Sequence, residues 1–77
     1  MSIIPLNSLE PGSTGIIKEF SDNPRFQSRL MEMGILPGEE VRMIKKTPFH
    51  GPLEIKIRSY YLSLRWEDAT EILVSQT

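Results

Sequence analysis

The segment 29–38, with the sequence RLMEMGILPG, constrains the fold more than any other part of the chain. Gly34 stands where a helix is expected to end, because glycine adopts the left-handed conformation at helix C-termini without a Cβ penalty. Pro37 cannot continue a helix, and Pro37-Gly38 suits a type II turn, which needs positive φ at its third residue. An alternating pattern typical of a β-strand starts directly afterwards, at residues 40–47. The segment therefore predicts one short helix inside a chain of strands.

The start of this helix is predicted close to residue 24. Asp22 and Asn23 are both suitable N-cap residues, and Pro24 suits the first helical position, where its missing N–H would have no partner. Three apolar side chains then recur at the spacing of one helical stripe: Phe26, Leu30 and Met33. We expect this stripe to cover one open end of the core.

The other apolar residues follow strand patterns. Five strands are predicted, at residues 14–20, 40–47, 53–58, 61–65 and 71–74. The third alternates without a fault, so Leu53, Ile55 and Ile57 should face inward, as should Leu62 and Leu64 of the fourth. Ser59-Tyr60 is a predicted turn, 66–69 a single helical turn, and 3–6 an apolar lead-in outside the strands.

Five short strands are best accommodated by closing the sheet on itself. A small closed barrel removes exposed strand edges and buries one face of every strand. The predicted fold class is therefore mostly β: a small SH3-like five-stranded barrel with one short helix inserted between strands 1 and 2. A chain of 77 residues has room for one domain, so residues 1–77 are predicted to form a single domain.

Composition excludes several kinds of site. The chain has no cysteine, which rules out disulfides, thiolate zinc sites and cysteine nucleophiles. The N-terminal residues lack the basic region and long apolar core of a signal peptide, and no apolar run approaches the length of a membrane span. We therefore expect a cytoplasmic protein that is not inserted directly into a membrane.

Catalytic and metal chemistry find little support in the sequence. His50 is the only histidine, and it has no neighbouring ligand at a metal-binding spacing. Glu67, Asp68 and Glu71 cluster near one predicted helical turn, which is more simply a solvated acidic surface. A small barrel fills its interior with side chains and leaves no substrate cavity. The chain is therefore predicted not to be an enzyme, with no cofactor and no metal site.

Nucleic acid is also an unfavoured partner. The net charge is −1, and a local basic group at Lys45, Lys46, Lys56 and Arg58 is interrupted by glutamates. This pattern is typical of a mixed-sign solvent face, whereas nucleic-acid binding needs a continuous positive field with stacking platforms. We therefore expect no nucleic acid to bind.

Three blocks of residues, taken in order, carry a family resemblance. They are Arg29-Leu30-x-x-Met33-Gly34-Ile35-x-Pro37-Gly38, Pro48-x-x-Gly51-Pro52-x-x-Ile55 and Leu62-x-Leu64-Arg65-x-x-Asp68-Ala69-x-x-Ile72-x-Val74. Together they resemble the FeoA family of ferrous iron transport proteins, over about residues 9–74. The resemblance implies a cytoplasmic SH3-like domain that assists FeoB, a membrane ferrous iron transporter with a cytoplasmic GTPase domain.

Two alternatives stand beside this interpretation. The same barrel type occurs as the C-terminal domain of iron-dependent repressors, which would make this chain a free-standing barrel that binds another protein or nucleic acid. Self-association into a homo-oligomer is the other alternative, through an exposed strand edge or a methionine-bearing face.

A protein-binding role directs attention to exposed large side chains. Aromatic residues, methionine and arginine are enriched at interface cores, and loops on rigid scaffolds often carry binding. The predicted partner-binding residues are Arg25, Arg29, Met31, Phe49 and His50. The predicted structural turn residues are Gly34, Pro37, Gly38 and Gly51.

Overall fold

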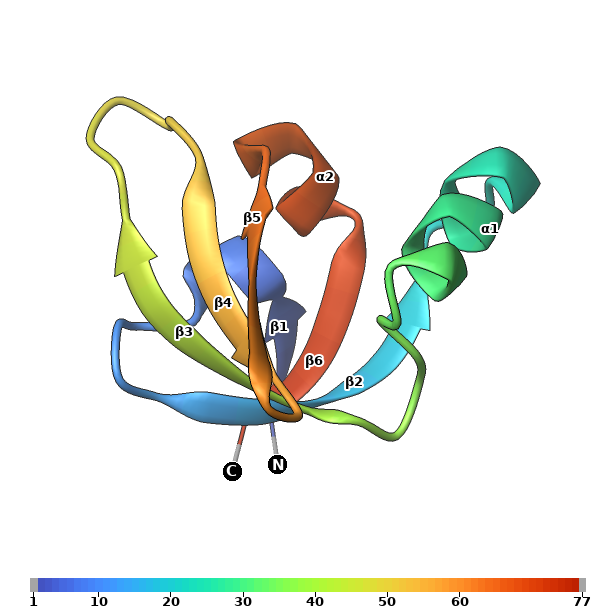
Figure 1. Ribbon diagram of the computed structural model, residues 1–77, viewed down its shortest axis with the longest axis horizontal. Helices are drawn as coiled ribbons and strands as arrows, with labels where there is room; N and C mark the ends of the chain where they lie inside the picture. Colours follow the sequence, from blue (N-terminus) through green and yellow to red (C-terminus); the bar gives the residue numbers. More distant parts are fainter. Residues whose placement is uncertain (1, 77) are drawn as a thin grey trace.

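The computed structural model describes residues 2–76, whose strands form one strongly curved antiparallel sheet (Figure 1). The strand order is β1-β6-β2-β3-β4-β5. The strands are β1 Ile3–Pro5, β2 Thr14–Phe20, β3 Glu40–Lys46, β4 Leu53–Ile57, β5 Tyr60–Leu64 and β6 Ile72–Gln76. The helices are the 3-10 turn η1 Leu6–Ser8, α1 Pro24–Glu32 and α2 Trp66–Thr70.

The first strand corrects the predicted strand count. The residues predicted as an apolar lead-in form β1, in which Ile3 pairs with Ser75 and Ile4 with Val74 of β6. The described sheet therefore has six strands, and the inserted helix α1 lies between the second and third of them. A three-residue strand that includes a proline is too short to show alternation, and its pairing partner is the last strand in sequence.

The turn between β4 and β5 lies one residue earlier than predicted. Ile57 pairs with Tyr60, so Arg58 and Ser59 form the two-residue connection and Tyr60 belongs to the strand. Arg58 has φ of 55°, and positive φ at the first central residue is typical of hairpin turns whose twist matches that of the strands. Glycine usually supplies this conformation, and its absence here explains the shifted prediction.

The alternation predicted for β4 is confirmed. Leu53, Ile55 and Ile57 are almost completely buried, and Leu64 of β5 is buried with Leu62 packed against the same core. Two strands carry register shifts: β2 between Ile17 and Glu19, and β3 between Met43 and Lys45. Such bulges bend a strand and increase its twist, which suits a sheet that curls around one core.

The N-terminus of α1 follows the predicted capping chemistry. The Asn23 side chain accepts hydrogen bonds from the backbone N–H groups of Arg25 at 3.1 Å and Phe26 at 3.3 Å, and Pro24 occupies the first helical position. Two helix donors that lack helical partners are thereby satisfied. Of the two predicted cap residues, Asn23 is the one used.

The C-terminus of α1 is a Schellman motif. Ile35 N–H donates to Leu30 O at 2.9 Å, Gly34 N–H donates to Met31 O at 3.0 Å, and Gly34 has φ of 87°. The following turn closes through a bond from Glu39 N–H to the carbonyl of Leu36 at 3.2 Å. Gly38 has φ of 92° at the position where a type II turn requires it.

The two edge strands of the sheet are β1 and β5, with η1 and α2 on the side between them (Figure 1). The Asn7 side-chain amide in η1 donates to the carbonyl of Trp66 at 3.3 Å and to Thr70 Oγ1 at 2.5 Å. These bonds join η1 to α2. The pairing described within residues 2–76 does not link β1 with β5, so closure into a barrel stays a prediction.

Candidate docking surfaces

The loop between β3 and β4, residues 47–52, presents a fully exposed aromatic ring. The Phe49 side chain is 100% exposed, and Phe49 and His50 are in the left-handed region with φ of 61° and 59°. Thr47 anchors the base of the loop, since its N–H and hydroxyl donate to Pro52 O at 3.2 and 2.6 Å. The two hydrogen bonds from Thr47 to Pro52 therefore fix the base of the 47–52 loop, and the loop carries a phenylalanine that is not packed against the rest of the chain.

His50 attaches this loop to α2. Its imidazole stacks on the Trp66 indole, with ring centroids 4.1 Å apart and an angle of 4° between the planes. A shallow hollow of about 200 Å³ lies at this stack. The residues lining it are His50, Gly51, Pro52, Arg65, Trp66 and Glu67.

Position 51 requires glycine because the side chain of Thr47 leaves no room for a Cβ atom. A Cβ added at this position would lie 2.9 Å from the Cβ and Cγ2 atoms of Thr47, closer than real Cβ contacts. Positive φ in this loop belongs instead to Phe49 and His50. The sequence pattern of prolines and glycine predicted the loop. It did not predict that Phe49 and His50 have positive φ while Gly51 is needed only for its lack of a side chain.

The predicted residues on α1 fall on two sides of the helix. Arg25 and Arg29 border a hollow that faces α2, whereas Met31, 51% exposed, borders a hollow that faces β2. Arg29 is already engaged, because its guanidinium lies 3.2 Å from Asp68 and 5.6 Å from the centre of the Phe26 ring. Among the predicted α1 residues, Arg25 and Met31 are thus exposed without an interaction of the kind that Arg29 makes with Asp68.

The acidic residues near α2 are partly neutralised. Asp68 contacts both Arg29 and Arg65, the latter at 3.7 Å, which leaves it poorly suited to an additional cation. Within residues 2–76, histidine and carboxylate side chains form no group of three arranged for a metal ion.

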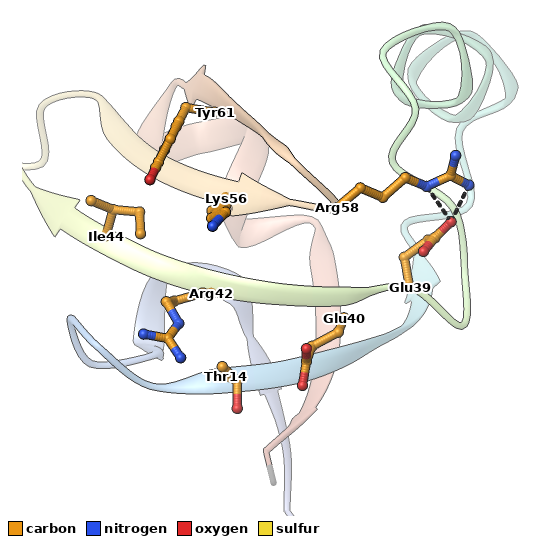
Figure 2. A pocket seen from close by; sticks show the side chains of 8 residues that line it. All are labelled: Thr14, Glu39, Glu40, Arg42, Ile44, Lys56, Arg58 and Tyr61. Atoms are coloured by element: carbon orange, nitrogen blue, oxygen red, sulfur yellow. Dashed lines mark hydrogen bonds and ion pairs between the residues drawn. The ribbon is translucent and has the colours of Figure 1, made fainter.

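Figure 2 shows a groove that sequence analysis did not identify, on the outer face of β3, β4 and β5. It has a volume of about 450 Å³ and is lined by Thr14, Glu39, Glu40, Arg42, Ile44, Lys56, Arg58 and Tyr61. Arg42 and Lys56 are direct cross-strand neighbours, and the Lys56 ammonium lies 5.7 Å from the centre of the Tyr61 ring. The register that aligns these residues depends on the β3 bulge, which the sequence does not reveal.

The same groove contains an ion pair between Arg58 and Glu39. The Arg58 Nε donates to Glu39 Oε1 at 2.8 Å, and Nη2 contacts the same oxygen (Figure 2). The hydrogen bond to Glu39, followed by the charge of that carboxylate, raises the pKa of Arg58 above its usual value. The basic group predicted at this place is therefore of mixed sign, with Lys45 also opposite Glu54.

The fold and these surfaces define a small, mostly β domain with one inserted helix, whose exposed features are a rigid loop and shallow hollows. The FeoA domain family matches residues 4–76, and the chain belongs to this family. Members of the family are non-catalytic accessory proteins, in agreement with the sequence-based expectation that the chain is not an enzyme. No helix within residues 2–76 has the length and apolar character needed to cross a membrane.

Relatives of known name and structure agree with this assignment. The chain is 32% identical over 69 residues to a Fe(2+) transport protein A/Fe(2+) transporter FeoB fusion protein of Porphyromonas gingivalis, a match that covers 90% of this chain and 8% of the fusion protein. The solution structure of a FeoA-like protein from Clostridium acetobutylicum matches with a TM-score of 0.87 and 32% identity, over 99% of this chain and 88% of that one.

Two further structures share the fold at lower identity. The crystal structure of an iron uptake regulatory protein, FeoA, matches with a TM-score of 0.91 and 22% identity, over 99% of this chain and all of that one. A manganese-dependent transcriptional repressor matches with a TM-score of 0.88 and 22% identity, over 97% of this chain but 42% of that chain.

Proposed function

We propose that this chain is a non-catalytic accessory protein of ferrous iron uptake, which binds the cytoplasmic part of a FeoB-type membrane transporter and regulates or scaffolds it. The observation that carries this proposal is the fusion protein, in which a domain similar to this one belongs to the same polypeptide as a Fe(2+) transporter. Covalent attachment gives two domains a high effective concentration, which favours an association that separate chains must achieve by affinity. The site of action is then the inner face of the membrane.

We assign the transporter contact to α1. This helix stands to one side of the sheet (Figure 1) and exposes Arg25 and Met31. An exposed methionine adapts to irregular apolar surfaces, and arginine is among the residues enriched in interface cores. Phe49 and His50, which the sequence also predicts as partner contacts, lie in the 47–52 loop. Glu67 of α2 lines both the hollow at His50 and the hollow bordered by Arg25.

Regulation requires that the chain bind one state of the transporter better than another. The test is binding, by biolayer interferometry, to the cytoplasmic domain and to the full-length form of the cognate transporter, each with and without guanine nucleotide. Nucleotide-dependent binding supports a regulator, and binding to the full-length form alone supports a scaffold. The proposal is wrong if neither form binds at low or physiological salt.

The contact on α1 has its own matched variants. Arg25→Glu and Met31→Glu should each weaken transporter binding at least about tenfold, the effect typical of central interface residues. Arg42→Glu makes the same charge change on the outer face of β3 and should leave binding unchanged. An Arg42→Glu effect as large as that of Arg25→Glu would place the contact on the sheet instead.

A repressor-like barrel is the second candidate, because this chain shares its fold with part of a manganese-dependent transcriptional repressor. At 22% identity this match concerns the fold alone. Filter binding of duplex DNA at increasing salt separates the candidates, since phosphate contacts make affinity fall steeply with salt.

The SH3-like barrel itself is part of the proposal. The hydrogen bonds from Asn7 to α2 place η1 and α2 together between the edge strands β1 and β5, which supports closure on that side. Closure predicts slow amide exchange in both edge strands, whereas an open sheet predicts fast exchange at their outward N–H groups.

A further inference from the structure

The 47–52 loop holds Phe49 in an unfavourable backbone conformation that no packing of its side chain compensates. A bulky side chain with φ of 61° is an outlier, whereas histidine, as at position 50, is several-fold enriched in this region. The ring at position 49 is 100% exposed, so no packing inside the chain compensates for the backbone conformation. Residues held in unfavourable backbone regions concentrate at functional contacts, where preorganisation is useful.

The loop is rigid enough to present this ring in a fixed direction. The bonds from Thr47 to Pro52 close its base, Gly51 N–H donates to Pro48 O at 3.3 Å, and the His50 imidazole stacks on Trp66. A rigid aromatic side chain loses little conformational freedom on binding, which is the property of an interface anchor.

A hollow of matching chemistry is lined in part by the residue that follows Phe49 in sequence. The hollow of about 200 Å³ begins at His50, the next residue in sequence, and its walls are the Trp66 indole, Pro52 and Gly51. The remaining lining residues have opposite charges: Arg65 and Glu67. One patch therefore contains a projecting apolar group, an apolar recess, a cation and an anion.

We propose that two copies of this chain associate about a two-fold axis, each placing its Phe49 ring in the hollow beside Trp66 of the other. In a two-fold interface the same patch faces itself, so a residue i that contacts j has its counterpart j contacting i. Arg65 of each copy then lies against Glu67 of the other. The patch is complementary to itself in charge and in apolar character, which points to a second copy as its occupant.

The dimer formed in this way is small and reversible. Standard stable interfaces bury about 800 Å² on each partner, whereas the whole accessible surface of the described chain is 4745 Å² and the patch covers one loop and one helical turn. The inference extends beyond the proposed function, since it concerns the isolated chain. The two contacts adjoin at Glu67, which lines both the hollow at His50 and the hollow bordered by Arg25.

The first test uses sedimentation equilibrium of the full chain from about 10 µM to about 1 mM, the range in which weak dimers become populated. Wild type should show a monomer–dimer equilibrium. Phe49→Asn should weaken the dimer at least about tenfold and raise the melting temperature, because asparagine tolerates the left-handed region. Tyr61→Asn removes another exposed ring, 56% exposed on β5, and should leave the dimer unchanged.

Three results would overturn the inference. They are a wild-type chain that stays monomeric throughout, a dimer that Phe49→Asn leaves intact, and a dimer that Tyr61→Asn weakens equally. A rise in melting temperature without any change in association would show that Phe49 is strained but unused.

The second test examines the two-fold arrangement through charge. Arg65→Glu gives a patch with two carboxylates and Glu67→Arg a patch with two guanidinium groups, so each variant alone should dimerise more weakly than wild type. Mixed in equal amounts, the two variants should form a heterodimer with two attractive pairs, stronger than either homodimer. A mixture no more associated than its components contradicts the proposed pairing, and circular dichroism of each variant checks that it is folded.

Discussion

At the scale of single residues, Gly34 has two independent reasons to be glycine. The first is its φ of 87°, which the sequence predicts from the end of a helical pattern followed by Pro37. The second is the Tyr60 hydroxyl, which donates to Met33 O at 3.0 Å and lies 2.0 Å from where a Cβ on Gly34 would stand. This contact joins β5 to the end of α1, and no local pattern in the sequence predicts it.

Gly34→Ala should therefore destabilise the chain by more than about 2 kcal/mol, through backbone strain and displacement of the Tyr60 hydroxyl. Gly34→Val should cost at least as much. In a Tyr60→Phe background the same alanine substitution should cost about 1 kcal/mol less, since the hydroxyl is gone. Urea unfolding of the four members of this cycle measures the difference, and equal costs in both backgrounds would disprove the contact.

Among the elements, α1 and β4 were predicted well because their determinants are local. The cap at Asn23, the stripe of Phe26 and Leu30, and the alternation of β4 all act over a few residues. β1 was missed because its strand is only three residues long and its partner β6 is remote in sequence. The turn at Arg58 was predicted one residue too late, because arginine occupies the positive-φ position at which a glycine would have indicated the turn.

The cap of α1 gives the prediction at this scale. Asn23→Ala removes the acceptor for Arg25 N–H and Phe26 N–H and should cost about 1 kcal/mol. Asp22→Ala is the matched control, because Asp22 precedes the cap and should change stability by less than about 0.5 kcal/mol. Thermal and urea unfolding measure the stability of both variants. A larger loss of stability for Asp22→Ala would show that Asp22, and not Asn23, caps the helix.

Over the whole molecule, a single cluster of buried side chains draws on the sheet, α1, η1 and α2 together. The ion pairs described within residues 2–76, Arg29–Asp68, Arg65–Asp68 and Arg58–Glu39, all involve exposed arginines, and pairs of this kind contribute little in water. Stability therefore rests on apolar burial, which is limited in a chain of this size.

One core truncation should therefore affect the entire chain. Ile55→Ala, at a fully buried position in β4, should cost about 2–5 kcal/mol, which is much of the stability of a small domain. Glu54→Ala, on the other face of the same strand, should change stability by less than about 0.5 kcal/mol. Far-ultraviolet and tryptophan-fluorescence unfolding curves should move together for Ile55→Ala, and separate transitions would contradict a single core.

The candidate docking surfaces show where prediction from sequence ends. The sequence by itself determined the helix, its two ends, the turn at Gly38, four strands close to their observed bounds and the loop that carries Phe49. Each depends on backbone preferences and periodicities that act between neighbours in sequence. Only the tertiary structure decided the β1–β6 pairing, the Tyr60 contact with Gly34, the stacking of His50 on Trp66 and the groove of Arg42 and Lys56. Those features depend on register and on contacts between distant segments, which form only when the whole sheet curls around its core.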